Sequence, residues 1–415
     1  MPIEHFKNEL PKKYNPQNTS SELLKKTFTI RLKEYKSIWS DISQSEMNAP
    51  EQHYIIQGVR GSGKTTLLTR LSIEVEENKA LTKWLIPIQF KEEEYGIGSL
   101  FGFWLRVAEE LEEHFQYGDL FTGLTEDIEA IESDEEDDTK IAFKLLNNAL
   151  TKNAKKIILF IDNIAELFDN FPSREKAILR EVLSQNPNLR IIGGSAISLE
   201  AFYDHKDPFY QFFKVITLKQ LTKKETIDLL TTLGEAAGNQ ELQKIKNVIK
   251  QNPEKIETIR RLTGGIPRTI VLLFDILAEG PKGSAFEYLD DTLDMTSPIY
   301  KHRMDDLTAQ QKPIVHAIAQ QWDAISVKEI AKKTRISSKT VSAQLAQLQK
   351  QWIVEKVPTD TKNHLYRLQE RFFNIWYFMR YGRKRDKTKL RWLTRFLEVW
   401  CTPEELLQRA KRYSN

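Results

Sequence analysis

Short runs of almost continuous apolar residues alternate with longer stretches of mixed residues through the first half of the chain. Such runs predict strands buried on both faces, because a strand with one face in water alternates apolar and polar positions. Strands are expected at residues 54–56, 83–90, 156–161, 189–195 and 214–218. Helices are expected at about 66–71, 99–115 and 173–184. This alternation predicts a parallel sheet with helices on both faces, an α/β fold.

The pattern changes on either side of this region. Residues 1–20 are polar and rich in Pro and Asn, which predicts a loosely packed arm, and residues 21–43 predict one amphipathic helix. Helices dominate from about residue 222 to about residue 300. Residues 306–368 then follow the order helix, helix, helix, hairpin. That order predicts a winged helix-turn-helix unit.

A glycine-rich loop joins the first predicted strand to the next helix. It has the pattern G-x-x-x-x-G-K-T and consists of Gly58, Val59, Arg60, Gly61, Ser62, Gly63, Lys64 and Thr65, with Thr66 next. Its glycines let backbone N–H groups surround a phosphate, and the helix N-terminus adds a partial positive charge. Lys64 is expected to reach the β- and γ-phosphates, and Thr65 to hold Mg²⁺. The loop predicts binding of a nucleoside triphosphate.

Asp162 offers a second oxygen ligand for the same metal. It directly follows the third predicted strand, the usual place for the carboxylate on the magnesium side of such a site. From there it would hold Mg²⁺ through water while the loop holds the phosphates. Together with the glycine-rich loop, Asp162 makes the prediction of a magnesium–nucleotide site much more specific.

Composition narrows the class of protein. The 415 residues are 40% hydrophobic and 29% charged, which predicts a globular protein of about two to three domains. One cysteine, Cys401, excludes an intrachain disulfide and suits a reducing cytoplasm. We expect a cytoplasmic location, with no signal peptide, membrane span or structural zinc site. The acidic stretch 126–138 is expected to be a solvated, mobile insertion.

On these residues the chain resembles the AAA+ and STAND ATPases, particularly the origin-recognition-like and archaeal-type members that carry a C-terminal winged helix. The resemblance covers about residues 45–370 and rests on the glycine-rich loop, Ile161-Asp162-Asn163, Ser195 and Gly264-Gly265-Ile266-Pro267-Arg268. It implies a P-loop NTPase parallel sheet with a helical lid, followed by an α+β winged-helix domain. The implied regions are an arm and helix (1–44), a P-loop ATPase core (45–221), a helical lid (222–305), a winged helix (306–370) and basic, aromatic C-terminal helices (371–415).

The resemblance also implies roles for two residues. Ser195, after the fourth strand, would be sensor 1, which orients the attacking water or the γ-phosphate. Arg268 would be sensor 2, which reaches the γ-phosphate from the lid. The residues themselves agree for Arg268, because Pro267 suits the first turn of a helix and would leave the arginine at its mouth. A turn arginine in a surface salt bridge is the alternative.

The chain departs from the family at Asn163, where a glutamate usually polarises the attacking water. Asn163 can hydrogen-bond water but cannot accept its proton. Either hydrolysis is slow, or another carboxylate substitutes. Glu93, with Glu92 and Glu94, ends a strand that could neighbour the strand before the glycine-rich loop. Glu166 is a further candidate, and an exposed loop is the alternative for the three glutamates.

Assembly and nucleic acid are the remaining expectations. ATPases of this type are completed by an arginine from a neighbouring subunit. Arg180 is the first candidate, ahead of Arg174 and Arg190. A homo-oligomer or a partner protein is therefore expected. Residues 326–350 and the basic residues 380–395 could bind DNA, whereas a winged helix of a STAND protein often packs on protein instead.

In the predicted recognition helix, the residues expected to be exposed are Ser338, Lys339, Thr340, Gln344 and Gln347, with Lys332, Lys333 and Arg335 just before it. The aromatic run 371–380 predicts core packing more than a platform for stacked bases. The favoured function is an ATP-binding switch that drives self-assembly or partner binding, as in signalling or defence. The alternatives are a DNA-dependent ATPase of initiator, loader or transposition type, and a DNA-binding regulator with a degenerate nucleotide site.

Overall fold

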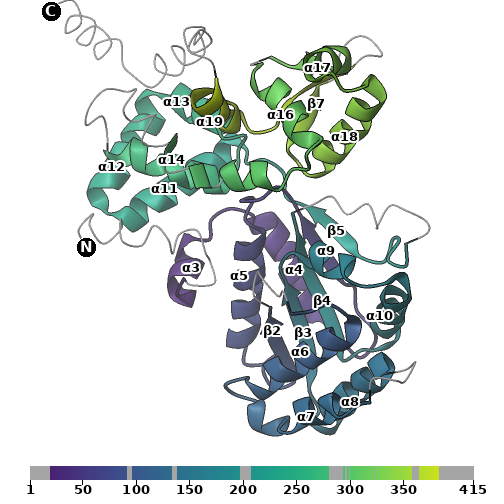
Figure 1. Cartoon of the computed structure of the whole chain (residues 1–415). Coiled ribbons are helices and arrows are strands. Elements are labelled where there is room, and N and C mark those ends of the chain that lie inside the picture. The colour runs from purple at the N-terminus through teal and green to yellow at the C-terminus, as the bar shows by residue number, and fades with distance from the viewer. Residues whose placement is uncertain are drawn as a thin grey trace, which may run out of the picture. The chain divides into compact units, whose positions relative to one another are not determined.

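The structure is a computed structural model in which the chain divides into two compact units, Pro11–Leu218 and Lys219–Asn415 with Met1–Leu10 (Figure 1). Each unit is described by itself. The described residues are 19–90, 96–132, 138–196, 207–279, 293–294, 297–298, 300–321, 323–357 and 364–382. The finer division of the chain into five regions stays a prediction.

The first unit is built on a parallel sheet. Its strands are β1 (Tyr54–Gln57), β2 (Leu85–Gln89), β3 (Lys156–Ile161), β4 (Leu189–Ser195) and β5 (Lys214–Thr217). They lie in the order β2-β3-β4-β1-β5, and every pairing is parallel. Both the strands and the predicted α/β fold are confirmed. Because the strands are parallel, the carboxyl ends of β3 and β4 lie on the same edge of the sheet as that of β1.

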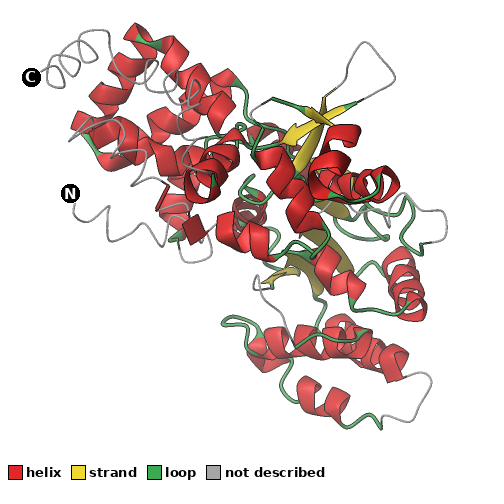
Figure 2. Ribbon diagram, turned by 45° about the horizontal axis from the view of Figure 1, so that its top comes forward, coloured by secondary structure: helices red, strands yellow, loops and turns green. Residues whose placement is uncertain are grey.

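Helices cover both faces of this sheet (Figure 2). The helices of the unit are α3 (Ser21–Thr27), α4 (Leu32–Gln44), α5 (Lys64–Glu77), α6 (Leu100–Glu112), α7 (Leu124–Glu129), α8 (Asp138–Lys152), α9 (Ile164–Asp169) and α10 (Ser173–Gln185), with a short 3₁₀ turn, η2 (Gly118–Leu120). Successive strand residues point to opposite faces. Leu159 and Ile191 therefore join one buried cluster with α6 to α10, and Ile158 and Ile192 join another with α4 and α5.

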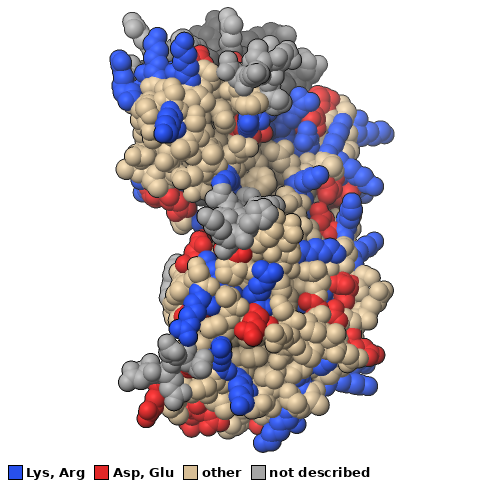
Figure 3. Space-filling model, turned by 90° about the vertical axis from the view of Figure 1, so that its right-hand side faces the viewer, with Lys and Arg blue, Asp and Glu red and all other residues tan. Residues whose placement is uncertain are grey.

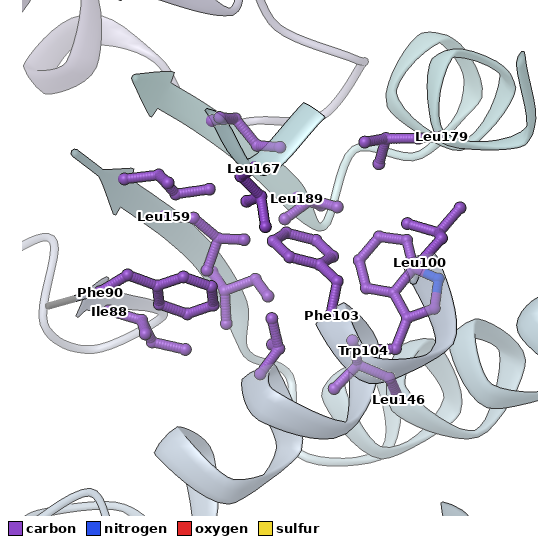
Figure 4. Packing of buried hydrophobic residues seen from close by; sticks show 14 of the residues in the cluster. Ile88, Phe90, Leu100, Phe103, Trp104, Leu146, Leu159, Leu167, Leu179 and Leu189 are labelled. Carbon is purple, nitrogen blue, oxygen red and sulfur yellow. The ribbon is translucent and has the colours of Figure 1, made fainter. Parts of the chain in front are cut away.

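Aromatic residues of α6 fill the larger of these clusters. Phe103 and Trp104 are fully buried and pack against strand residues such as Leu159 and Leu189 (Figure 4). Their rings meet at 62° with centroids 4.9 Å apart, the edge-to-face geometry that aromatic pairs favour. One face of the sheet is thus covered by a closely packed apolar layer.

Two expectations about this unit are wrong in detail, and a short helix was not predicted. Residues 21–43 form two helices, because Arg31 adopts a left-handed conformation (φ 63°) between α3 and α4. The acidic stretch 126–138 is not an insertion throughout, because α7 packs Ile128 into the core and α8 begins at Asp138. Residues 133–137 lie outside the described residues. The short helix α9 was also missed, since its six residues give too little periodicity to detect.

The second unit contains a group of helices followed by a winged helix. The helices are α11 (Lys223–Ala237), α12 (Asn239–Gln251), α13 (Pro253–Leu262) and α14 (Pro267–Glu279), which cluster together in Figure 1. The winged helix, which is confirmed, comprises α16 (Gln311–Ala319), β6 (Ile325–Ser326), α17 (Val327–Thr334), α18 (Ser338–Lys350), β7 (Val354–Val357) and β8 (Leu365–Leu368). Its antiparallel sheet has the order β6-β8-β7.

The last described helix, α19 (Arg371–Tyr381), carries the aromatic run. Phe372, Phe373, Trp376 and Tyr377 are buried, and Trp376 Nε1 donates to Ser297 Oγ at 2.8 Å. The rings therefore pack inside the unit, as expected, and do not form a platform for stacked bases. None of the described helices combines the length and apolar character needed to cross a bilayer.

Candidate functional site

The glycine-rich loop leaves the carboxyl end of β1 and turns directly into α5. Gly63 precedes the first residue of α5 and has φ 96°, a left-handed conformation that a side chain would strain. The Gly58 N–H donates to the carbonyl of Ser195 at 3.1 Å, which ties the start of the loop to the end of β4. The loop is thus held by the sheet edge at one end and by a helix N-terminus at the other.

Lys64 is the first residue of α5 and is only 6% exposed. Its Nζ donates to the loop carbonyls of Gly58 at 2.9 Å and Val59 at 3.1 Å. A buried ammonium needs such partners, and neutral carbonyl oxygens are weaker partners than the charged oxygens of a phosphate. The side chain is therefore held over the loop, where an anion bound there would meet it.

Thr65 and Asp162, the two predicted magnesium ligands, lie in direct contact. The Thr65 hydroxyl donates to Asp162 Oδ2, and the backbone N–H of Asn163 donates to Asp162 Oδ1 at 3.0 Å. Asp162 is 7% exposed, so its carboxylate stays oriented by these two donors. A hydroxyl and a carboxylate oxygen are the hard ligands that Mg²⁺ prefers.

Gly194 leaves the room in which that carboxylate lies. A Cβ at Gly194 would be 2.6 Å from Asp162 Oδ1 and 3.1 Å from Leu68 Cδ1. The next residue, Ser195, is fully buried and pairs in register with Gln57 of β1. The carboxyl ends of β1, β3 and β4 therefore bring the predicted Ser195 and Asp162 to the same sheet edge.

Two buried polar atoms at this edge have no hydrogen-bond partner among the described residues. They are Ser62 Oγ in the loop and Gln57 Oε1 at the end of β1. Unsatisfied buried polar atoms are uncommon in folded proteins and occur where a ligand or water supplies the partner. With the loop, Lys64 and the Thr65–Asp162 pair, these atoms fit a site for a magnesium-bound nucleotide.

The strand order overturns one premise about the catalytic base. We expected Glu93, with Glu92 and Glu94, on a strand beside β1, but β3 and β4 separate β2 from β1. Residues 91–95 themselves lie outside the described residues. Glu166 lies beside the loop, because its Oε1 is 3.9 Å from Nη2 of Arg60.

The three arginines considered for a neighbouring site differ in exposure. Arg190 is 1% exposed, donates to the Gln52 carbonyl at 3.1 Å and pairs with Asp41, so it cannot reach another subunit. Arg180, the first candidate, donates to the carbonyl of Pro208 and lies over a phenylalanine ring. Arg174 is exposed near the start of α10. The burial of Arg190 could not be foreseen from its position in a strand end.

Arg31 also supports the loop, although nothing in the sequence marks it as part of the site. This arginine is 3% exposed and its Nε donates to the carbonyl of Ser62 at 3.1 Å, so it supports the loop from outside. No motif links Arg31 to Ser62, which lies 31 positions away. An arginine in a predicted amphipathic helix is ordinarily expected to be exposed. Only the fold could reveal the contact.

Arg268 belongs to the second unit. Pro267 is the first residue of α14, as predicted, and Arg268 follows it at the helix N-terminus, partly exposed. Gly264 and Gly265 precede this helix with φ 62° and 63°. The geometry at the start of α14 is the expected one, and the sensor role of Arg268 stays a prediction.

The predicted recognition helix α18 exposes most of the expected set. Ser338, Lys339 and Gln347 are exposed, as are Lys332, Lys333 and Arg335 before them, whereas Thr340 and Gln344 are partly buried. Gln344 and Gln347 form hydrogen bonds with Gln310 and Gln311 at the start of α16. Elsewhere, Lys and Arg are mixed with Asp and Glu on the face drawn in Figure 3. Residues 383–395 lie outside the described residues.

Comparisons with known proteins agree with this architecture. An ATPase domain family described as predominantly from Archaea matches residues 31–273, and the MarR family matches residues 305–362. None of the curated proteins matches the chain.

Among solved structures, the chain is similar to Orc1 of Aeropyrum pernix in complex with DNA, with 14% identity and a TM-score of 0.44 over 88% of this chain and 94% of that one. It is similar to Cdc6p of Pyrobaculum aerophilum, with 15% identity and a TM-score of 0.43 over 90% and 99%. A STAND protein with a tetratricopeptide repeat sensor from Pyrococcus horikoshii has 15% identity and a TM-score of 0.35 over 92% and 46%. Because the archaeal-type family matches more than half of the chain, the chain belongs to the family of ATPase domains found predominantly in Archaea.

Proposed function

We propose that the protein is an ATP-binding switch of the AAA+ and STAND type, in which bound ATP changes assembly of the chain with itself or with a partner protein. The observation that carries this proposal is Asn163, which directly follows the magnesium-side Asp162. An amide cannot take a proton from water at neutral pH, so hydrolysis should be slow and the ATP-bound state long-lived.

Each site residue has a role in this proposal. Backbone N–H groups of the loop and Lys64 bind the β- and γ-phosphates. Thr65 and Asp162 hold Mg²⁺, which when bound neutralises phosphate charge. Ser195 and Arg268 contact the γ-phosphate and so distinguish ATP from ADP. Arg31 keeps the loop in its binding conformation through the Ser62 carbonyl.

The proposal is tested by restoring the missing base. We expect wild type to bind a fluorescent ATP analogue with turnover only slightly above that of Lys64→Ala. Asn163→Glu should raise turnover at least tenfold, because general base catalysis contributes about 10²–10⁴-fold. Asn163→Asp is the control, since its carboxylate is shorter. If wild type turns ATP over fast and Asn163→Glu does not raise that rate, the proposed switch is wrong.

A DNA-dependent ATPase is the second candidate, favoured by exposed basic residues on and around α17 and α18. They are Lys328, Lys332, Lys333, Arg335, Lys339 and, on the wing, Lys356. Such residues bind phosphates of a duplex, and each contact adds about 0.9 to the slope of log affinity against log salt.

That candidate is tested with Lys332→Gln/Lys333→Gln/Arg335→Gln on a duplex of mixed sequence. We expect weaker binding and a salt slope lower by about 3. The matched control removes equal charge from exposed lysines outside the winged helix, with Lys246→Gln/Lys250→Gln/Lys301→Gln. DNA that stimulates wild-type turnover would favour this function over the switch. Equal losses in both triple variants would mean that the winged helix has no specific role in binding.

A further inference from the structure

A carboxylate is buried where the winged helix ends. Glu370 lies between β8 and α19, caps α19 and is 3% exposed. Its Oε1 accepts from Thr269 Oγ1 at 2.8 Å and from the Tyr300 hydroxyl at 2.5 Å. Its Oε2 accepts from Arg303 Nη1 at 2.5 Å. The residues that surround the carboxylate come from parts of the chain that are 67 to 101 positions away.

These three donors satisfy the hydrogen-bonding capacity of the buried carboxylate. Arg303 balances its charge, and burial raises the pKa of Tyr300 so that this hydroxyl keeps its proton and donates. Buried ion pairs add little stability compared with apolar residues of similar size. What they do provide is a fixed geometry, because losing any one partner leaves a buried charge without its hydrogen bonds.

The cluster lies directly beside the predicted sensor. Thr269 is the residue after Arg268 on α14, and it is 4% exposed. The turn before α14 also approaches the cluster, because a Cβ at Gly264 would be 3.3 Å from the carbonyl oxygen of Gln369. The start of α14 is therefore bonded to Glu370 through Thr269, and the turn before it lies against the backbone of Gln369.

We propose that Glu370 is a positioning residue for Arg268: through Thr269 it fixes the start of α14, so that Arg268 is aligned for the γ-phosphate and its alignment depends on the end of the winged helix. This inference rests on the proposed function, because it assumes that Arg268 contacts the γ-phosphate. It adds that the C-terminal unit sets the preference of the site for ATP over ADP.

The test separates positioning from stability by comparing ATP with ADP. Thr269→Val removes the donor next to Arg268, and Thr269→Ser keeps it. We expect Thr269→Val to weaken ATP binding about fivefold, the value of one hydrogen bond, with ADP binding unchanged. Thr269→Ser should restore the wild-type ratio of the two affinities. A merely structural role would lower both affinities together, or only the melting temperature.

Tyr300→Phe provides the comparison, since it removes another donor from the same oxygen and keeps the Thr269 hydroxyl that donates from α14. It should lower the melting temperature and leave the ATP-to-ADP ratio at the wild-type value. If Tyr300→Phe changes that ratio as much as Thr269→Val does, the effect comes from the whole cluster and positioning through Thr269 is wrong.

A double-mutant cycle with Arg268→Ala completes the test. If Glu370 acts through Arg268, adding Thr269→Val or Glu370→Gln to Arg268→Ala should weaken ATP binding no further. Additive losses would overturn the positioning role while leaving the proposed function intact. If Arg268→Ala alone binds ATP and ADP as wild type does, the sensor role in the proposed function is wrong, and the positioning role falls with it.

Discussion

At the scale of single residues, the site depends on how closely Asp162 is packed. Its carboxylate accepts from Thr65 and from the N–H of Asn163, and Gly194 leaves it just enough space. A carboxylate held in this way pays little reorganisation cost when it binds a metal, because the protein has already oriented it. The magnesium side of the site is therefore sensitive to changes smaller than the loss of a ligand.

Gly194→Ala tests this sensitivity. The added Cβ would lie 2.6 Å from Asp162 Oδ1, so the carboxylate must shift, at a cost of about 1–3 kcal/mol. We expect ATP affinity in the presence of Mg²⁺ to fall at least tenfold, and affinity in EDTA to change little. Gly98→Ala is the control, because a Cβ there meets nothing within 4 Å. A loss that is equal with and without Mg²⁺ would contradict the assignment of Asp162 to the metal.

A second prediction concerns which carboxylate acts as the base in any ATP hydrolysis that wild type carries out. Glu166 lies 3.9 Å from Arg60 of the loop, whereas the strand before Glu93 is not next to β1. We expect Glu166→Gln to reduce whatever turnover wild type has, with unchanged ATP affinity, and Glu93→Gln to have no effect. Steady-state turnover against the Lys64→Ala blank measures both. The reverse result would return the role to Glu93 despite the strand order.

At the scale of elements, buried polar links join helices and strands around the sheet. His53, just before β1, accepts from the Ile191 N–H at Nδ1, 3.0 Å away, and lies 3.1 Å from the Leu183 carbonyl at Nε2. With Nδ1 accepting, Nε2 carries the single proton and donates, so the ring is neutral. Burial, with the charge of Arg190, lowers the pKa of His53 from 6.5 to about 4.

This neutral histidine makes stability depend on pH. The unfolded chain takes up a proton at His53 near pH 6.5, but the folded chain resists until about pH 4. The contribution is therefore complete above pH 6.5 and is lost as pH falls to about 4, by about 3 kcal/mol. Urea unfolding between pH 7 and pH 4 measures it. His53→Gln, which offers both a donor and an acceptor, should lack this part of the pH dependence, and equal slopes would contradict it.

Among the elements, those predicted most accurately from the sequence are the strands formed by long apolar runs. The strands β3 and β4 have the predicted bounds, because runs buried on both faces have few alternatives. It failed where a single residue breaks a periodic pattern, as Arg31 does between α3 and α4. It also failed for α9, whose six residues span too few turns for periodicity to appear.

At the scale of the whole molecule, the proposed switch requires assembly that depends on ATP. Light scattering should show a larger mass with ATP than with ADP, and Lys64→Ala should stay at the ADP mass with either nucleotide. An unchanged mass with ATP would contradict self-assembly and direct attention to a partner protein.

Assembly also predicts a shared site. Arg174 is exposed, whereas Arg190 is buried. Arg174→Ala should bind ATP but turn it over more slowly, because a neighbour's arginine stabilises transition-state charge. Mixing Arg174→Ala with Lys64→Ala should recover part of the turnover, since the second variant still supplies Arg174. Activity no higher than the sum of the two would contradict an arginine shared between subunits.

The sequence by itself determined the candidate residues of the site. The glycine-rich loop, Lys64, Thr65 and Asp162 are recognisable because the chemistry demands those residue types at the ends of strands and helices. Their conformations depend mostly on near neighbours, as the left-handed Gly63 before α5 illustrates. Local pattern was enough for the loop, the strands and the winged helix.

Only the tertiary structure decided which distant residues support that site. The order of the strands separated β2 from β1, the Arg31 side chain reached the Ser62 carbonyl, and Glu370 accepts hydrogen bonds from three donors on two distant segments. None of these leaves a periodic or spaced signal, because each depends on how the chain crosses over between elements. Burial makes these contacts important for stability, because a charged group removed from water needs hydrogen-bond partners within the protein.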